Sequence, residues 1–198
     1  MDNIYFTSDL HFGHDAMLAL RPFFSITEMN KILISNWNEV VGTSGIVYIL
    51  KDITMEENPN IVYGFLSQLN GRKVLVRGNH DRITQDNFDK KYLEEVVEYL
   101  ELYYLGQRFV LSHYPLIDWN GKYKGAISLY GHIHSYSWDT LSKINGRSYD
   151  VGVDANFYAP VCINEIINKC EIITHLGEST NLIHERKSKD KWLIEKQV

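Results

Sequence analysis

The sequence predicts an α/β sandwich in which two β-sheets pack face to face and helices cover their outer sides. Strand-like and helical runs alternate over the first part of the chain, which is typical of a parallel sheet wrapped by helices. From about residue 96 onward, strand-like runs follow one another without a clear helix between them, which predicts a second, largely antiparallel sheet. The 198 residues, 44% of them apolar, suffice for one sizeable core.

In the first part of the chain, the expected strands are residues 4–8, 46–50 and 73–77, each a hydrophobic run rich in β-branched or aromatic side chains. Between the first two strands, Ser25 or Thr27 can cap a helix with apolar residues at helical spacing. Between the second and third strands, Asn58-Pro59 is a helix start with proline in the first turn.

In the second part, the strand-like runs are residues 96–105, 108–112, 126–130 and 149–153. We assign residues 1–176 to one domain. Residues 177–198 are mixed in charge and form a C-terminal extension, which is either a short peripheral helix or a solvated tail.

Composition restricts the partners. No apolar run approaches the roughly 18 to 20 residues of a membrane span, and the acidic, polar N-terminus does not resemble a signal peptide. We therefore expect a cytoplasmic protein without a membrane partner, whose two cysteines, Cys162 and Cys170, are reduced. The net charge of −5 argues against binding to long duplex nucleic acid, but it permits a small phosphorylated substrate.

Five of the expected strands end in polar side chains that can bind metals or move protons. These residues are Asp9 and His11, Asp52, Asn79 with His80 and Asp81, His113, and His132 with His134. Ligand-binding groups of open α/β sheets lie beyond the carboxyl ends of strands. Carboxylate, amide and imidazole groups together suit divalent metals. The pattern therefore indicates a site for two such ions, whose remaining positive charge would attract phosphate.

The motifs Asp9-x-His11, Asp52, Gly78-Asn79-His80-Asp81, His113 and Gly131-His132-x-His134, in this order, resemble the signature of the calcineurin-like metallophosphoesterase superfamily. The resemblance covers residues 4–134, and residues 150–154 resemble the strand that follows in small prokaryotic and phage members. It implies that residues 1–176 are an α/β/β/α metallophosphoesterase domain. The implied reaction is hydrolysis of a phosphodiester or phosphomonoester by attack of metal-bound hydroxide.

The resemblance also implies a role for each motif residue. Asp9, His11 and His134 would bind the first metal, Asn79, His113 and His132 the second, and Asp52 would bridge them. His80 would protonate the leaving oxygen or stabilise charge on the phosphoryl group, and Asp81 would orient it. The ions would be Mn²⁺, Fe²⁺, Zn²⁺ or Ni²⁺.

Four further residues are candidates for substrate binding, each with a simpler alternative. His14 either lines the pocket or helps to start a helix. Arg77 and Arg82 either hold a phosphate or form surface salt bridges. Tyr114 belongs to aromatic-rich loops near the expected metals, which either stack on a base or pack among themselves. A nucleotide is therefore one candidate for the substrate.

Lys51 departs from the family pattern, because members usually have glycine immediately before the bridging aspartate. Lys51 either adopts an ordinary backbone conformation or stores strain, and its ammonium either enters the pocket or points to solvent. This departure supports a second hypothesis: a catalytically weak or inactive metal-binding scaffold that recognises a phosphorylated or protein partner. The His80-Asp81 pair favours the enzyme, because a binding module needs no proton donor.

Overall fold

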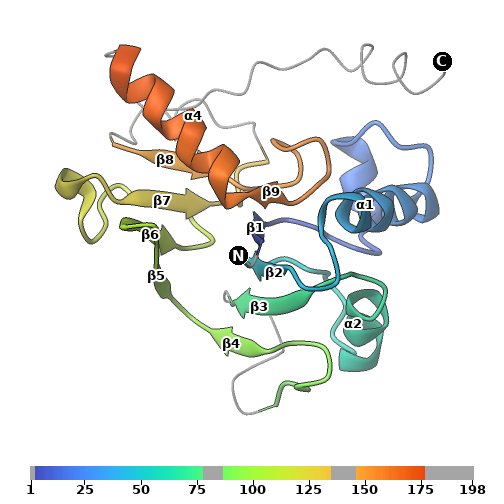
Figure 1. Ribbon diagram of the computed structural model, residues 1–198. Helices are drawn as coiled ribbons and strands as arrows, with labels where there is room; N and C mark the ends of the chain where they lie inside the picture. Colours follow the sequence, from blue (N-terminus) through green and yellow to red (C-terminus); the bar gives the residue numbers. More distant parts are fainter. Residues whose placement is uncertain (1–2, 78–86, 135–145, 177–198) are drawn as a thin grey trace.

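The computed structural model describes residues 3–77, 87–134 and 146–176, with side chains described up to residue 171. Two sheets pack face to face, and Figure 1 shows the first sheet between the second sheet and the helices α1 and α2. The predicted fold class is confirmed, with an α/β arrangement of two sheets and flanking helices.

The first sheet has the strand order β4-β3-β2-β1-β9. Its strands are β1 (Ile4–Thr7), β2 (Ile46–Ile49), β3 (Arg72–Val76), β4 (Glu95–Val97) and β9 (Val161–Cys162). The first four are parallel, whereas β9 runs antiparallel to β1 at the edge. The parallel strands deliver their carboxyl ends to the same side of the sheet.

The second sheet has the order β5-β6-β7-β8, with β5 (Leu100–Tyr104), β6 (Gln107–Leu111), β7 (Ile127–Tyr130) and β8 (Ser148–Asp150). Only β5 and β6 pair antiparallel, while β6 with β7 and β7 with β8 are parallel. The prediction of a largely antiparallel sheet is therefore wrong. The connections after β6 and β7 are long enough to return to the same end of the sheet, as parallel pairing requires.

The predicted strand 96–105 is also wrong, because two strands in different sheets replace it. β4 pairs with β3 in the first sheet, and β5 pairs with β6 in the second. Continuous strand-like composition cannot reveal where a chain leaves one sheet for the other.

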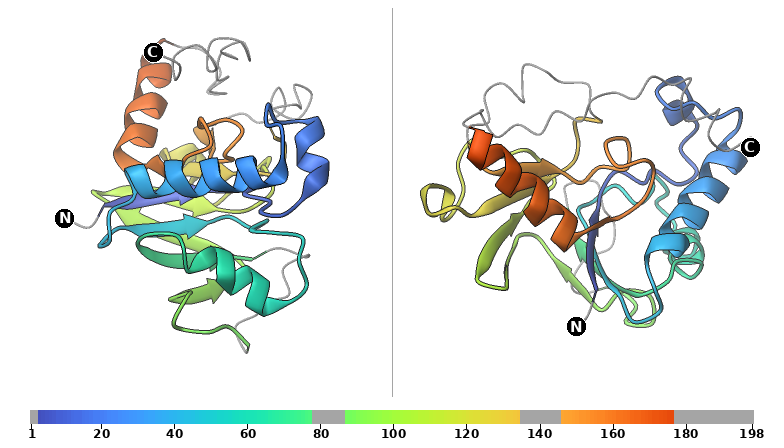
Figure 2. Two further views of the ribbon diagram at one scale, coloured as in Figure 1. Left: turned by 90° about the vertical axis from the view of Figure 1, so that its right-hand side faces the viewer. Right: turned by 45° about the horizontal axis from the view of Figure 1, so that its top comes forward.

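The helices α1 (Ile26–Val40) and α2 (Pro59–Leu66) lie on one face of the first sheet, as both views of Figure 2 show. Their predicted starts are confirmed: the Ser25 side chain accepts a hydrogen bond from Glu28 N, and that of Asn58 accepts one from Asn60 N. Short 3-10 helices, η1 (Asp15–Ala19) and η2 (Lys122–Lys124), lie in connecting segments.

The helix α4 (Ile163–Leu176) was not predicted from the sequence. Ile163, Ile166 and Cys170 on this helix are buried in the core between the two sheets. Their spacing is helical, so the signal was present in the sequence. Cys162 and Cys170 are both free cysteines.

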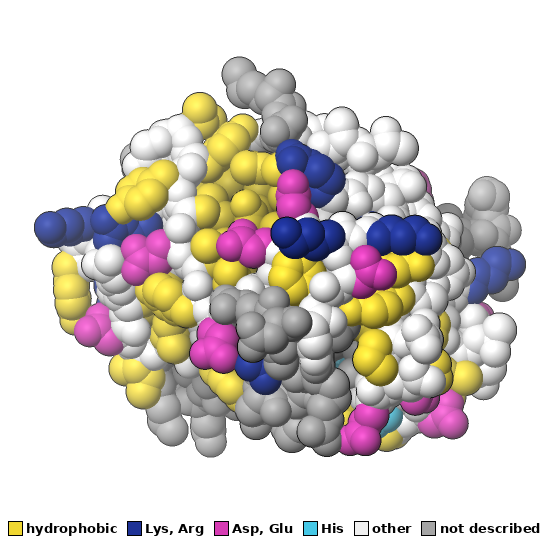
Figure 3. Space-filling model, turned by 90° about the horizontal axis from the view of Figure 1, so that it is seen from below, with side chains coloured by type: hydrophobic (Ala, Val, Ile, Leu, Met, Phe, Trp, Pro, Cys, Tyr) yellow, Lys and Arg dark blue, Asp and Glu magenta, His cyan; other side chains and the backbone are white. Residues whose placement is uncertain are grey.

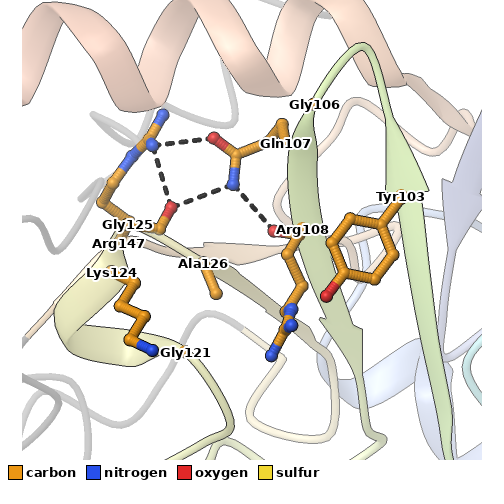
Figure 4. Close-up of a pocket in the computed structure, with 9 residues that line it drawn as sticks. All are labelled: Tyr103, Gly106, Gln107, Arg108, Gly121, Lys124, Gly125, Ala126 and Arg147. Carbon is orange, nitrogen blue, oxygen red and sulfur yellow. Dashed lines mark hydrogen bonds between the residues drawn. The ribbon is translucent and has the colours of Figure 1, made fainter.

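The end of the second sheet at which β6, β7 and β8 begin is held together by side chains (Figure 4). Arg147 Nη1 donates to Gln107 Oε1 over 2.8 Å and to the Gly125 carbonyl over 2.9 Å. The Gln107 amide donates to the same carbonyl over 2.9 Å. These groups line a pocket of about 230 Å³. It lies at the amino ends of the strands, opposite the carboxyl ends where the candidate site is found.

On the face shown in Figure 3, basic and acidic side chains are interspersed among groups of hydrophobic ones. Near β3 and β4, Arg72 pairs with Glu94 and Arg77 with Glu98, each over 3.0 Å. Within the described part of the chain, no helix is long and apolar enough to cross a membrane.

Candidate metal centre

The loops that follow β1 and β2 run side by side, which brings their polar residues together. Asp9 N donates to the Lys51 carbonyl over 3.3 Å, and His11 N donates to the Asp52 carbonyl over 2.9 Å. The parallel pairing of the strands thus continues into the loops. Asp52 reaches Asp9 and His11 although more than forty positions separate them in the sequence.

The backbone at this edge is held in an uncommon conformation. Asp9, His11, Asp52, His132 and His134 have φ angles of 59°, 51°, 53°, 73° and 46°. Residues other than glycine rarely adopt this left-handed region, because the Cβ atom crowds the backbone. Such residues concentrate at functional sites, where the surrounding structure enforces them.

One group of potential metal ligands comprises Asp9, His11 and His134, whose ligand atoms all lie within 4.8 Å of one another. Asp9 Oδ1 is 4.0 Å from His11 Nε2 and 3.9 Å from His134 Nε2. Among the described residues, Asp9 Oδ1 and both ring nitrogens of His11 are buried without a hydrogen-bond partner. Buried polar atoms normally have partners. Asp9 Oδ1 and His11 Nε2 therefore fit a metal ion.

A second group comprises Asp9, Asp52 and His113, so that Asp9 belongs to both. Asp52 Oδ2 lies 3.6 Å from His113 Nε2 and 3.7 Å from His11 Nε2, which places this oxygen between the two imidazoles. His132 Nδ1 lies 3.2 Å from His113 Nε2. Six of the seven sequence-predicted ligands are thus brought together.

Burial sets the protonation of these ligands. It lowers the pKa of His11 and of His113 to about 3 and also lowers that of exposed His132. Burial raises the pKa of Asp9 to about 6. At neutral pH the imidazoles of His11 and His113 are therefore neutral, and their lone pairs are available to a metal.

Hydrogen bonds at Nδ1 orient the rings of two histidines, His113 and His134. His113 Nδ1 lies 3.0 Å from the Leu50 carbonyl, which can only accept, so the proton is on Nδ1 and Nε2 keeps its lone pair. His134 Nδ1 lies 2.7 Å from Asp154 Oδ2 in the same arrangement. Carboxylates and carbonyls commonly orient metal-binding histidines in this way.

Asp154 is in turn held by Arg21, whose Nε and Nη2 each donate to the carboxylate over 2.8 Å. Burial raises the pKa of Asp154, but the hydrogen bonds and charges of His134 and Arg21 together outweigh burial and bring the value to about 2. Burial by itself would lower the pKa of His134. The hydrogen bond to Asp154 and the charges of Asp9 and Asp154 together outweigh burial, so the pKa of His134 is raised. Arg21 is only 2% exposed and also donates to the Asp9 carbonyl over 2.6 Å.

The sequence analysis missed both Arg21 and Asp154 as site residues. Asp154 ends the segment 150–154 that resembles a family strand, so a signal for it existed. Arg21 lies 133 positions from its partner and in no motif, so only the tertiary structure could associate them.

Lys51 adopts the strained conformation, with a φ of 67°, and its side chain faces the site rather than solvent. The residue is 1% exposed, and its ammonium lies 3.8 Å from Asp52 Oδ1. The same ammonium lies 5.2 Å from the centre of the Tyr114 ring.

Among the candidates for substrate binding, Tyr114 and His14 lie beside the ligands. The Tyr114 ring is centred 4.5 Å from that of His132, and the His14 ring 5.4 Å from that of His11. Arg77 pairs with Glu98, the residue after β4, and this salt bridge was its alternative role. Four predicted residues lie outside the described residues: Asn79, His80, Asp81 and Arg82.

The family model for calcineurin-like phosphoesterases matches residues 3–194. The chain belongs to the calcineurin-like phosphoesterase family. This match includes much of the segment 177–198, which lies outside the described residues and whose assignment as an extension stays a prediction.

Relatives of this phosphoesterase-family protein are small proteins of archaea and phages, as expected. Uncharacterized protein MJ1445 of Methanocaldococcus jannaschii is 36% identical, covering 86% of this chain and 93% of the relative. Gene 66 protein of Mycobacterium phage L5 is 32% identical, covering 78% and 88%. The crystal structure of a protein of unknown function, AQ665 from Aquifex aeolicus, matches with a TM-score of 0.68 and 26% identity, covering 85% of this chain and 99% of that one.

Proposed function

We propose that the protein is a metal-dependent phosphoesterase that hydrolyses a phosphodiester or phosphomonoester at a site for two divalent ions. One observation carries the proposal: two groups of Asp and His ligands share Asp9, and the buried Asp9 Oδ1 and His11 nitrogens have no described hydrogen-bond partner. When bound, two divalent ions lower the pKa of a water molecule and neutralise charge on a phosphoryl group.

The chain's own residues divide between the two positions. Asp9, His11 and His134 hold one ion, and His113, His132 and Asn79 hold the other. Asp52 is shared, which the position of its Oδ2 between His11 and His113 supports. The mixture of carboxylate and imidazole ligands suits Mn²⁺, Fe²⁺, Zn²⁺ or Ni²⁺.

His80 donates a proton to the leaving oxygen and Asp81 orients it, an assignment that rests on the family resemblance. The substrate is a small phosphorylated molecule. Tyr114 supports a nucleotide or small diester, because this side chain is 41% exposed next to His132 and can stack on a base.

A scaffold without turnover is the second candidate function. The observation that favours it is the Lys51 ammonium 3.8 Å from Asp52 Oδ1, because a cation there competes for a carboxylate that the enzyme needs. Such a scaffold would bind a phosphorylated or protein partner through the same loops.

The test is hydrolysis of a chromogenic phosphodiester beside a chromogenic monoester by metal-stripped protein, with Mn²⁺, Ni²⁺, Zn²⁺ or Mg²⁺ added back. The wild type is compared with His80→Ala and with His184→Ala, a histidine outside every motif. We expect activity to return with metal, and His80→Ala to lose most of it while binding the same amount of metal.

Three other outcomes would support different conclusions. If the protein binds two metals but hydrolyses neither ester, the scaffold is favoured. A clear preference for the monoester would overturn the choice of a diester. Loss of a metal from His80→Ala would show that the division of roles is wrong.

A further inference from the structure

The Lys51 ammonium is held against one side of the candidate metal centre. The side chain is 1% exposed, lies 3.8 Å from Asp52 Oδ1 and stacks on the Tyr114 ring. Its backbone carbonyl accepts a hydrogen bond from Asp9 N over 3.3 Å. The backbone of Lys51 is thus tied to the loop that carries Asp9, and moving the ammonium away from Asp52 would also remove it from the Tyr114 ring.

The Lys51 ammonium lies beside the ligands of one metal position. The Tyr114 ring that it contacts is centred 4.9 Å from the His113 ring and 4.5 Å from the His132 ring. The Arg21-Asp154 pair instead supports His134, on the side of the other position. The ammonium thus lies on the side of His113 and His132.

We propose that Lys51 makes the two metal positions unequal, so that the position on the side of His113 and His132 binds a divalent ion more weakly than the position formed by Asp9, His11 and His134. The ammonium occupies one side of the Asp52 carboxylate and repels a second cation nearby. The inference rests on the proposed two-metal site and assigns a role to the one motif position at which this chain departs from the family pattern.

Binding of Mn²⁺ alone tests the inference without reference to activity. Metal-stripped protein is titrated with Mn²⁺ and followed by calorimetry and by the electron paramagnetic resonance signal of free, single and paired ions. We expect two unequal steps for the wild type. Lys51→Met should strengthen the weaker step by about tenfold or more and change the stronger step less, because like charges this close repel strongly in protein.

Lys73→Met is the matched control. Lys73 is also buried, at 7% exposure, but its ammonium donates to the Gly71 carbonyl over 2.8 Å at the start of β3. This lysine is at the amino end of its strand, away from the metal ligands. Its replacement should leave both Mn²⁺ steps as they are in the wild type.

Comparing Lys51→Gly with Lys51→Met separates the effect of the charge from that of backbone strain. If circular dichroism shows that Lys51→Met does not fold, Lys51→Gly takes its place in the titration. Both variants remove the charge, but only glycine relieves the φ of 67°. An equal gain in both variants supports the charge mechanism. A gain in Lys51→Gly alone, with folded Lys51→Met unchanged, would overturn it.

Two further results distinguish the failure of this inference from that of the proposed function. If the wild type binds two Mn²⁺ ions and neither Lys51 variant alters the second step, Lys51 has no such role and the two-metal site stands. If the wild type and both variants bind no Mn²⁺, the proposed function fails, and this inference fails with it.

Discussion

Asp154 holds the imidazole of His134 through a hydrogen bond of 2.7 Å between Oδ2 and Nδ1. A carboxylate can only accept, so His134 Nδ1 carries the proton and Nε2 faces Asp9 with its lone pair. Arg21 fixes Asp154 through two hydrogen bonds of 2.8 Å. The position of one predicted metal ligand therefore depends on two residues that belong to none of its motifs.

Replacing Asp154 with Asn should weaken metal binding by roughly 10- to 100-fold, the usual effect of losing such a supporting residue. The neutral amide weakens the bonds to both His134 and Arg21. Calorimetric titration with Mn²⁺ measures the change. Glu94→Gln is the control, because Glu94 is an exposed carboxylate paired with Arg72 on the surface. Unchanged affinity in folded Asp154→Asn would show that the support is dispensable.

Gly131→Ala should destabilise the protein by about 1–3 kcal/mol, the usual cost of overpacking. A Cβ atom at this position would collide with Ser8 Oγ and with Asp9 Oδ2, so we also expect weaker binding of Mn²⁺. Urea unfolding and metal titration measure the two effects.

Gly64→Ala is the matched control for this variant. A Cβ atom at Gly64, in α2, would have no described atom within 4 Å. Alanine should stabilise this helix by up to about 1 kcal/mol. If both variants had the same stability, the contact of Gly131 with Asp9 would not be the cause.

Affinity for Mn²⁺ should decrease as the pH falls from 7 to 5. Burial raises the pKa of Asp9 to about 6, so a proton competes with the metal for this carboxylate at lower pH. The pKa of His134 is also raised, so a second proton competes for this imidazole. His11 and His113, with pKa values lowered to about 3, remain neutral over this range. Each competing proton weakens binding by up to about tenfold per pH unit. Equilibrium dialysis between pH 7 and pH 5 tests this, and a constant affinity would contradict it.

Asp150→Asn should become increasingly stabilising as the pH rises from 5 to 8. Burial raises the pKa of Asp150 to about 8, so the folded protein binds a proton that the unfolded chain has lost. Stability from this group is present at low pH and is lost as the pH rises through 8. The Asn oxygen can still accept from Gly152 N, as Asp150 Oδ1 does over 2.8 Å.

Urea unfolding of the metal-stripped wild type and Asp150→Asn at several pH values tests this prediction. Asp9 is present in both proteins, so the difference between them isolates Asp150. A constant difference would show that the buried carboxyl does not titrate in this range.

The helices and strands of the first sheet were largely predictable from the sequence, whereas the pairing of the later strands was not. The strands β1, β2 and β3, together with the starts of α1 and α2, could be predicted because apolar periodicity and capping residues act over a few positions. The separation of β4 from β5 could not, because both have the same local composition and differ only in the sheet that pairs with them. The parallel pairing of β6, β7 and β8 depends equally on contacts between distant segments.

The side chains that could bind metal were predictable from the chain, because aspartates and histidines follow several hydrophobic strands in a recognisable order. The surroundings of these side chains became apparent in the folded protein. It brought Arg21 and Asp154 together across 133 positions and turned the Lys51 ammonium toward Asp52. The physical reason is that ligand identity depends on local sequence, whereas burial, orientation and charge at a site depend on residues that meet only when the sheets pack.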